Sequence, residues 1–303
     1  MRRKLTAALL TAAMAISLTA CGGSGDTASA GASTGETASV TEAGATTTAS
    51  GKEVLRVAMS ADYAPFDWLQ EDDSNGAVMT SNGSYMNGYD VLVAKYIAEK
   101  LDMDLEITQI DWDGLILSIQ SGKVDCVIAG QSITSERQQM VDFTEPYYYA
   151  SIITLVKSDG DYADAASVAD LKGVTCTSQQ NTIWYDSCLP QIENANVLAP
   201  ADSAPAMIMQ LETGMVDYVC TDMPTAIAAV AKNDSLVILN FSGTDGDFQF
   251  ASEEERAENV NIGISVQKGN TALAEAIDAV LSTMTEDDFN ALMDQAISIQ
   301  PEI

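Results

Sequence analysis

The sequence predicts a two-lobed α/β protein, in which each lobe is built on a sheet with a core of parallel strands and two strands form a hinge between the lobes. Short apolar runs rich in β-branched residues alternate with segments whose apolar residues recur at helical spacing, which is the pattern of βαβ units. The same order of elements occurs twice along the chain. Residues 121–130 (SGKVDCVIAG) and 213–222 (TGMVDYVCTD) share a phrase in which a Gly and a Val-Asp pair precede an apolar strand. This repetition indicates two lobes of similar design.

The first half of the chain contains the predicted elements of the first lobe. Residues 55–59 (LRVAM) and 124–129 (VDCVIA) are short apolar runs suited to strands that are covered on both faces. Between them, apolar residues at helical spacing predict helices over 90–101 and 112–121, the second ending at Gly122. These strands and helices are parts of a βαβαβ pattern.

The second half repeats this order. Its predicted elements are a strand at 174–177, a helix at 184–189, a strand near 197, a helix at 204–213 and a strand at 218–221. Two further strands, 151–156 and 261–266, flank this half and are the predicted connections between the lobes. Strand ends and helix amino termini of both lobes converge on the cleft between them, which is the expected binding site.

The predicted organisation has four parts. They are a lipoprotein signal peptide over 1–20, a flexible linker over 21–52, a first lobe over 53–150 plus 264–303, and a second lobe with the hinge strands over 151–263. The linker consists mainly of Gly, Ala, Ser and Thr and has no aromatic residue, so it cannot bury enough apolar surface to fold.

The amino-terminal sequence has the pattern of an export signal, so the protein is predicted to be exported. Residues 2–4 are basic, and the apolar stretch 5–20 is too short to anchor a helix across a bilayer. Residues 18–21 (LTAC) resemble the bacterial lipobox, in which the cysteine after the cleavage site is acylated. Cys21 is therefore the predicted lipidation site and first residue of the mature protein. The alternative is an ordinary signal cleaved near Ala20 with an incidental cysteine.

Composition excludes several classes of partner. The chain carries 44 acidic and 14 basic residues, a formal net charge of −30, so nucleic acid is an unsuitable partner. There is no histidine and no CxxC spacing, and we therefore expect neither a metal site nor a cofactor.

Four cysteines follow Cys21, namely Cys126, Cys176, Cys188 and Cys220. Most lie in predicted core strands and are expected as buried thiols, although the sequence leaves disulfides among them open.

Several fragments occur together in one order. They are YAPF at 63–66, GYDV at 88–91, WDGL at 112–115, GKVD at 122–125, SITSER at 132–137, DFTEPYY at 142–148, QQNT at 179–182 and the VD pair at 216–217 that leads to Asp222. In this order they closely resemble the bacterial extracellular solute-binding proteins of family 3, the receptors of polar amino acid importers. The resemblance covers nearly everything from residue 53 onward and implies a type II periplasmic-binding-protein fold.

The resemblance also implies roles for charged residues. A zwitterion needs a cation for its carboxylate and an anion for its ammonium. Arg137 stands at the family's carboxylate-binding arginine, and its planar fork can make two charge-assisted hydrogen bonds. Asp222 stands where the family binds the ammonium. Taken alone, an arginine here would be a surface charge and the aspartate a helix cap, so both roles depend on the surrounding motifs.

The remaining implied site residues are polar or aromatic. Thr182 helps to hold the carboxylate near a helix start, Gly130 offers a carbonyl to the ammonium, and Ser132 offers a hydroxyl to the carboxylate. Tyr63 and Trp112 sandwich the ligand side chain; otherwise they are core aromatics.

This sequence departs from the family in two places that bear on the site. Asn181 stands where the family usually has Gly. Ser60 stands where relatives that prefer basic amino acids often have Asp, although Asp62, Asp67 and the insertion 71–87 could supply acid. The particular amino acid therefore stays open.

These observations predict a monomeric, lipid-anchored protein on the outer face of the cell membrane, or in the periplasm of a Gram-negative cell. It captures an amino acid and delivers it to the permease of an ABC importer. One alternative is a sensory lipoprotein that presents a bound amino acid to a receptor. Another is a dehydratase-like enzyme on the same fold, but no set of nucleophile, base and orienting residue is visible in the sequence.

Overall fold

The computed structural model describes residues 51–301, and all of them belong to one compact unit. The predictions for the signal peptide, for Cys21 and for nearly all of the linker lie outside the described residues. Among the helices in the described range, none is long and apolar enough to cross a bilayer.

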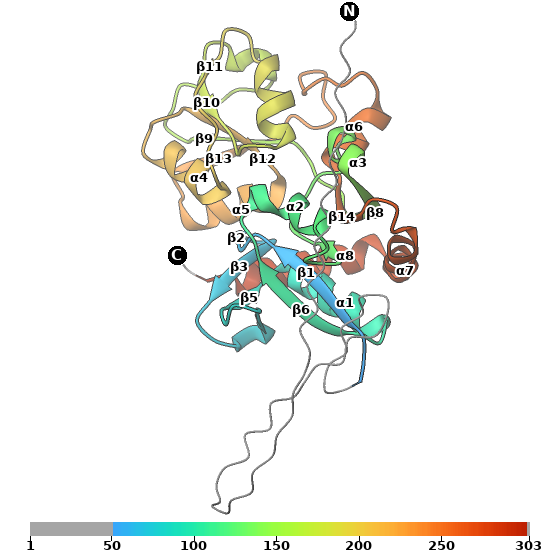
Figure 1. Cartoon of the computed structure of the whole chain (residues 1–303). Helices are drawn as coiled ribbons and strands as arrows, with labels where there is room; N and C mark the ends of the chain where they lie inside the picture. Colours follow the sequence, from blue (N-terminus) through green and yellow to red (C-terminus); the bar gives the residue numbers. More distant parts are fainter. Residues whose placement is uncertain (1–50, 302–303) are drawn as a thin grey trace, which may run out of the picture. The chain divides into compact units, whose positions relative to one another are not determined.

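The first lobe is built on a five-stranded mixed sheet with the order β6-β1-β7-β14-β8 (Figure 1). Three strands are parallel: β1 (Val54–Met59), β6 (Asp104–Gln109) and β7 (Cys126–Val127). Strand β14 (Ile262–Gln267) pairs antiparallel with both β7 and β8 (Val141–Tyr148). The helices of this lobe are α1 (Tyr89–Lys100), η2 (Trp112–Gly114), α2 (Leu115–Gln120), α3 (Ser135–Met140), α7 (Thr271–Leu281) and α8 (Glu286–Ile299).

The second lobe has a sheet of the same design, with the order β11-β10-β12-β9-β13. Strands β10 (Thr175–Thr177), β11 (Asn196–Val197) and β12 (Tyr218–Thr221) are parallel, and β9 (Ile153–Lys157) is antiparallel to β12 and β13 (Leu236–Leu239). Its helical segments are η3 (Val168–Leu171), η4 (Trp184–Cys188), η5 (Leu189–Gln191), α4 (Ala204–Glu212), α5 (Met223–Lys232) and α6 (Glu253–Val260). The two-lobed α/β prediction is confirmed.

The two strands expected as connections lie in opposite sheets. β9 follows the first-lobe strand β8 along the chain but pairs in the second sheet, and β14 follows second-lobe residues but pairs in the first. Each fills the fourth position of its sheet. The adjacent chain segments at the crossing are therefore β8 and β14, where Tyr148 pairs with Ile262, rather than the two expected strands with each other.

A third, smaller sheet uses much of the insertion at 71–87. Its order is β2-β3-β5-β4, and its strands are β2 (Asp62–Tyr63), β3 (Asp67–Gln70), β4 (Val78–Met79) and β5 (Tyr85–Asn87), with the short helix η1 (Ser74–Gly76) between β3 and β4. The pairing is antiparallel throughout. This sheet fixes the position of Tyr63, which lies in β2 and pairs with Asp67 of β3.

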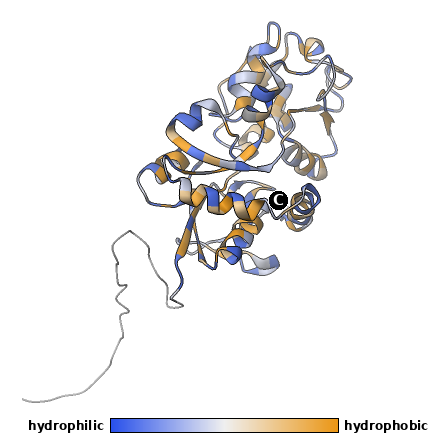
Figure 2. Cartoon of the chain, turned by 90° about the vertical axis from the view of Figure 1, so that its right-hand side faces the viewer, coloured by the Kyte–Doolittle hydropathy of each residue, from blue (hydrophilic) through white to orange (hydrophobic). Residues whose placement is uncertain are grey.

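Both main sheets are buried on two faces, as the apolar strands predict. In β1, Val57 belongs to the cluster that packs against α1 and α8, whereas Ala58 faces the cluster around α2. In β12, Cys220 and Val219 likewise face two different clusters. Orange hydrophobic positions alternate with blue hydrophilic ones along the helices in Figure 2, consistent with elements packed on one side. The four cysteines of the described part, Cys126, Cys176, Cys188 and Cys220, are buried free thiols.

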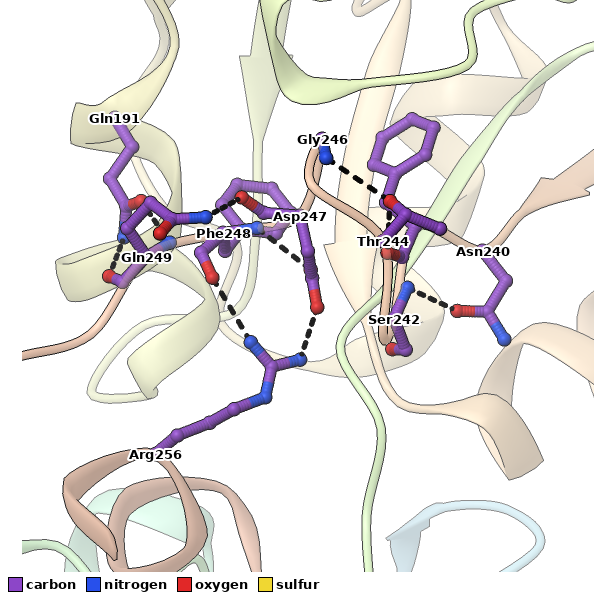
Figure 3. Close-up of polar contacts among 10 residues, drawn as sticks. Gln191, Asn240, Ser242, Thr244, Gly246, Asp247, Phe248, Gln249 and Arg256 are labelled. Atoms are coloured by element: carbon purple, nitrogen blue, oxygen red, sulfur yellow. Dashed lines mark hydrogen bonds and ion pairs between the residues drawn. The ribbon is translucent and has the colours of Figure 1, made fainter. Parts of the chain in front are cut away.

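The segment between β13 and α6 is held by an ion pair in which Asp247 is buried and Arg256 is half-buried. Arg256 lies 2.8 Å from the carboxylate of Asp247 and donates a 3.0 Å hydrogen bond to the carbonyl oxygen of Phe248 (Figure 3). Because these contacts tie α6 to the loop before it, they fix the stretch of chain that leads into β14.

Candidate functional site

Asp222 lies at the junction of β12 and α5, where a parallel strand ends and a helix begins. It is fully buried, and its carboxylate caps α5 by accepting hydrogen bonds from the backbone N–H of Thr225 at 2.9 Å and from the Thr225 hydroxyl at 3.1 Å. The helix-cap interpretation of this residue is therefore correct in the structure. It does not exclude a ligand role, because a second contact joins the same carboxylate to the other lobe.

That second contact comes from Tyr63 in β2. Its hydroxyl donates a hydrogen bond to Asp222, so a first-lobe phenol and a second-lobe carboxylate meet between the two main sheets. The Tyr63 ring stacks on Phe66 with centroids 4.9 Å apart and lies directly against Gly130. Gly130 has a left-handed φ of 62°, and a Cβ there would lie 2.5 Å from Cε1 of Tyr63. Only glycine allows the ring this position.

Burial dominates the electrostatics of Asp222. Its desolvation raises the pKa of the carboxyl group, and the hydrogen bonds from Tyr63 and Thr225 oppose that rise. A buried carboxylate of this kind is stabilised by a cation that replaces the lost water. The position therefore favours a positively charged group.

Arg137 supplies the opposite charge from α3, whose amino terminus is capped by the side chain of Thr134. Nη1 donates to the carbonyl oxygen of Ser132 at 2.8 Å, and Nη2 donates across to the second lobe, to the carbonyl oxygen of Asn181 at 2.7 Å. The guanidinium lies over the Trp112 ring, 5.3 Å from its centroid. Burial lowers the pKa of Arg137 to about 10, which leaves the group charged at neutral pH.

The aromatic rings connect the two charges. The centroids of Trp112 and Tyr63 lie 6.5 Å apart in an edge arrangement, so Arg137, Trp112, Tyr63 and Asp222 follow one another across the site. The Trp112 indole also donates to the carbonyl oxygen of Gln180 at 3.2 Å, a further bond between lobes. The structure thus brings together both charged residues and both aromatic residues that the sequence singled out.

Two predicted residues make mainly local contacts. The Thr182 hydroxyl donates to the carbonyl oxygen of Gln179 at 2.7 Å, which shapes the loop at the start of the helical segment. Ser132 contacts Arg137 through its carbonyl oxygen rather than its hydroxyl. Both residues are nevertheless buried beside the guanidinium.

A cavity of about 480 Å³ is lined in part by Arg137. Its lining comes from both lobes: Trp112, Asp113, Ile116 and Leu117 of η2 and α2, residues 134–137 and Met140 of α3, and Asn181, Thr182, Ile183 and Asp186 of the second lobe, among others. Polar groups from both lobes therefore share one hollow with the arginine.

Sequence reasoning missed several residues of this site. Phe66 supports the Tyr63 ring, Thr225 holds the Asp222 carboxylate, and Asp113 accepts hydrogen bonds from Gln180 and Asn181. Phe66 and Asp113 lie inside the family-like fragments YAPF and WDGL, and their position in those fragments is the signal that could have identified them.

Further buried acids lie behind Tyr63. Asp67 is fully buried and accepts from the backbone N–H of Ala61 at 2.7 Å and from the Ser60 hydroxyl at 3.1 Å, and burial raises its pKa to about 6. Asp90 is also fully buried, with one oxygen bonded to the Tyr147 hydroxyl at 2.7 Å; burial raises its pKa well above the usual range. Within residues 51–301, no cluster of acidic or sulfur side chains is arranged to hold a metal ion.

Fold and site together define a class of architecture. Two lobes whose main sheets share one strand order meet through a cation, a carboxylate and aromatic rings, which is an arrangement suited to binding a small polar molecule between lobes.

Residues 55–298 match the bacterial extracellular solute-binding proteins of family 3, and the chain belongs to that family. The proteins it resembles are binding proteins, and the chain is a binding protein rather than an enzyme.

Its relatives are named for different amino acids. The chain is 29% identical over 222 residues to a probable histidine-binding protein of Campylobacter jejuni, covering 73% of this chain and 80% of the relative. It is 26% identical to an L-cystine-binding protein of Escherichia coli, covering 77% and 78%. Among solved structures, it resembles an amino acid ABC transporter substrate-binding protein of Streptococcus pneumoniae bound to L-arginine. The TM-score is 0.65, the identity 27%, and the match covers 81% of this chain and 94% of that one.

Proposed function

We propose that this protein captures an amino acid between its lobes and delivers it to the permease of an ABC importer. The observation that carries the proposal is the meeting of opposite charges at the contact between lobes, with Arg137 on one side and Asp222 on the other and two aromatic rings between them. A molecule that carries a carboxylate and an ammonium a few ångströms apart satisfies both. The relatives are named as probable histidine-binding and L-cystine-binding proteins, and one similar structure holds L-arginine, which supports the same class of ligand.

In the proposed site, Arg137 binds the α-carboxylate through its planar fork, with Thr182 and Ser132 beside it. Asp222 and the carbonyl of Gly130 receive the α-ammonium, and Tyr63 and Trp112 cover the side chain of the ligand. The burial of both charged residues supports these roles, because a buried charge that finds no partner is costly and the correct ligand removes that cost.

Binding and closure are proposed to be coupled. Contacts from both lobes to one ligand favour the state in which the lobes are together, by as much as the ligand prefers that state. The crossing of the chain at β8 and β14 is the natural place for the motion, because only short segments join the two sheets there.

The ligand test is a thermal-shift screen of the twenty amino acids with cystine, ornithine and citrulline, followed by calorimetry on every compound that stabilises the protein. A ligand at about 100 times its Kd adds about 2.7 kcal/mol of stability. We expect at least one amino acid to bind with one-to-one stoichiometry. If none binds while the protein is folded, the proposed function is wrong.

The membrane location is proposed to rest on acylation of Cys21. The lipobox-like residues 18–21 support it, and a linker of some thirty residues would hold the folded part away from the bilayer at roughly 30 Å. Replacing Cys21 with Ser is expected to move the protein from the membrane fraction to the medium or periplasm. Retention in the membrane would rule out this anchor.

Measuring amino acid uptake distinguishes an importer's binding protein from a sensory lipoprotein. Cells that lack the gene are expected to lose uptake of the bound radiolabelled amino acid, and restoring the gene should return it. Normal uptake together with a lost response to that amino acid would favour the sensory lipoprotein instead.

A further inference from the structure

Two consecutive residues of the second lobe, Gln180 and Asn181, form hydrogen bonds with three side chains of the first lobe. The carbonyl oxygen of Gln180 accepts from the Trp112 indole at 3.2 Å, and that of Asn181 accepts from Arg137 at 2.7 Å. In the other direction, the two amide side chains donate to one carboxylate, that of Asp113: Gln180 Nε2 at 3.0 Å to Oδ2 and Asn181 Nδ2 at 2.7 Å to Oδ1. All four bonds cross between the lobes.

These four bonds differ in what they need from the sequence. The two carbonyl acceptors belong to the backbone and would be present with any residues at 180 and 181. The two donors to Asp113 are side-chain amides, so they depend on Gln180 and Asn181 themselves. Asp113 in turn presents both carboxylate oxygens, one to each amide. The side-chain part can therefore be removed by mutation without touching the backbone part.

The backbone at Asn181 adds a second observation. Its φ of 55° is left-handed, a conformation that glycine adopts without cost and that asparagine tolerates better than most residues. Asparagine thus gains an amide donor toward Asp113 that glycine lacks, while it keeps the same chain path. The loop of Thr182 depends on that path.

We infer that Asp113, Gln180 and Asn181 form an interlobe clasp that sets how long the lobes stay closed on their amino acid. This inference rests on the proposed function and deepens it, because it names residues that control release without belonging to the set that contacts the ligand. The bonds to Asp113 exist only while the lobes are together, so they act on the closed state and must break before the ligand leaves.

The solvent exposure of the clasp residues determines how strongly the clasp slows dissociation of the ligand. Asp113 and Asn181 lie at the exposed rim, where water competes for their hydrogen bonds, so the clasp is worth less than a buried ion pair. Breaking one such bond is expected to speed dissociation by about threefold to tenfold. Association is expected to stay within about twofold, because the bond forms after the ligand has entered.

The test compares Asn181→Gly with Asn194→Gly in the full-length protein. Asn194 is a matched control: it is exposed in the same lobe, has a φ of 56°, and its amide donates only to its neighbour Glu193 at 3.3 Å among the bonds found in the described residues. Dissociation of L-arginine, L-histidine and L-cystine is measured singly by stopped-flow tryptophan fluorescence. Faster release from Asn181→Gly, with wild-type release from Asn194→Gly, supports the clasp. Equal release from all three proteins overturns it.

Two further variants test the mechanism. Asn181→Asp places a like charge beside Asp113 and is expected to speed release more than Asn181→Gly does, by an amount that shrinks in high salt. In an Asp113→Ala background, Asn181→Gly is expected to change release by less than about twofold, because its partner is already gone. If the two effects multiply instead, they do not act through one bond and the clasp is wrong.

The clasp and the proposed function fail in different ways. If none of the three amino acids nor any other in the screen binds the wild type, the proposed function is wrong. The clasp then still predicts faster amide hydrogen exchange over 112–118 and 178–184 in both Asn181→Gly and Asp113→Ala than in wild type. Unchanged exchange in both segments overturns it.

Discussion

Replacing Asp222 with Asn tests the charge at the centre of the proposed site while preserving its shape. The asparagine oxygen can still accept from the backbone N–H of Thr225, which Asp222 caps at 2.9 Å, so α5 keeps its first turn. The negative charge is lost, and the ammonium of an amino acid would then be buried without a counter-ion. Removing one partner of a buried charge pair costs roughly 2 to 5 kcal/mol, which corresponds to a Kd about 30 to 4,000 times higher.

Calorimetry with the amino acid found in the screen measures that change, and thermal unfolding of the same sample controls for the fold. Asp222→Ala is the useful contrast, because it also removes the helix cap and should lose about 1 kcal/mol of stability in addition. If Asp222→Asn binds within twofold of the wild type, the carboxylate does not hold an ammonium and the assignment is refuted.

The pH dependence of binding offers an independent readout of Asp222. Burial raises its pKa, so the carboxyl group takes up a proton at a higher pH than an exposed aspartate does. Only the ionised form attracts an ammonium. Affinity in the wild type should therefore fall as pH falls through that raised pKa, and it should be flat over the same range in Asp222→Asn.

Three further predictions address other parts of the site. Arg137→Lys should raise the Kd at least tenfold while the protein stays folded, because Lys cannot present two parallel donors to a carboxylate; equal calorimetric affinity would contradict this. Gly130→Ala should lower stability by about 1 to 3 kcal/mol more than Gly122→Ala in chemical unfolding, because both glycines have positive φ but only Gly130 lies against the Tyr63 ring. Asp67, whose pKa of about 6 is raised above its unfolded value, stabilises the fold below about pH 4 and loses that contribution, on the order of 3 kcal/mol, as pH rises through about 6. The melting temperature of Asp67→Asn should thus decline less between pH 5 and 7 than that of the wild type, and parallel curves would contradict the assignment.

Local patterns predicted most of the framework. The apolar run at 55–59 became β1, the helical spacing over 90–101 became α1, and the stretch 218–221 became β12. In each case the decisive information is burial on one or two faces, which recurs with the period of the element and is therefore readable along the chain. The repeated phrase likewise led to β7 and β12, which hold the third position in their two sheets.

The sequence did not predict which sheet each connecting strand joins. Residues 151–156 and 261–266 were expected to connect the lobes, but the sequence gives no indication that β9 and β14 enter opposite sheets. Both are apolar strands with the same period. Which sheet each one joins depends on the edge that is free once the parallel strands have assembled, and that is a property of the packed lobe.

The sequence by itself determined the composition, the two-lobed pattern and the residue types at the site, because these depend on neighbours along the chain and on motifs of fixed spacing. Only the tertiary structure decided that Tyr63 contacts Asp222 and that Asp113 holds Asn181, pairs separated by 159 and 68 positions. Hydrogen bonds act over about 3 Å, so such pairs exist only when the two lobes are brought to one relative position. No local pattern encodes that position.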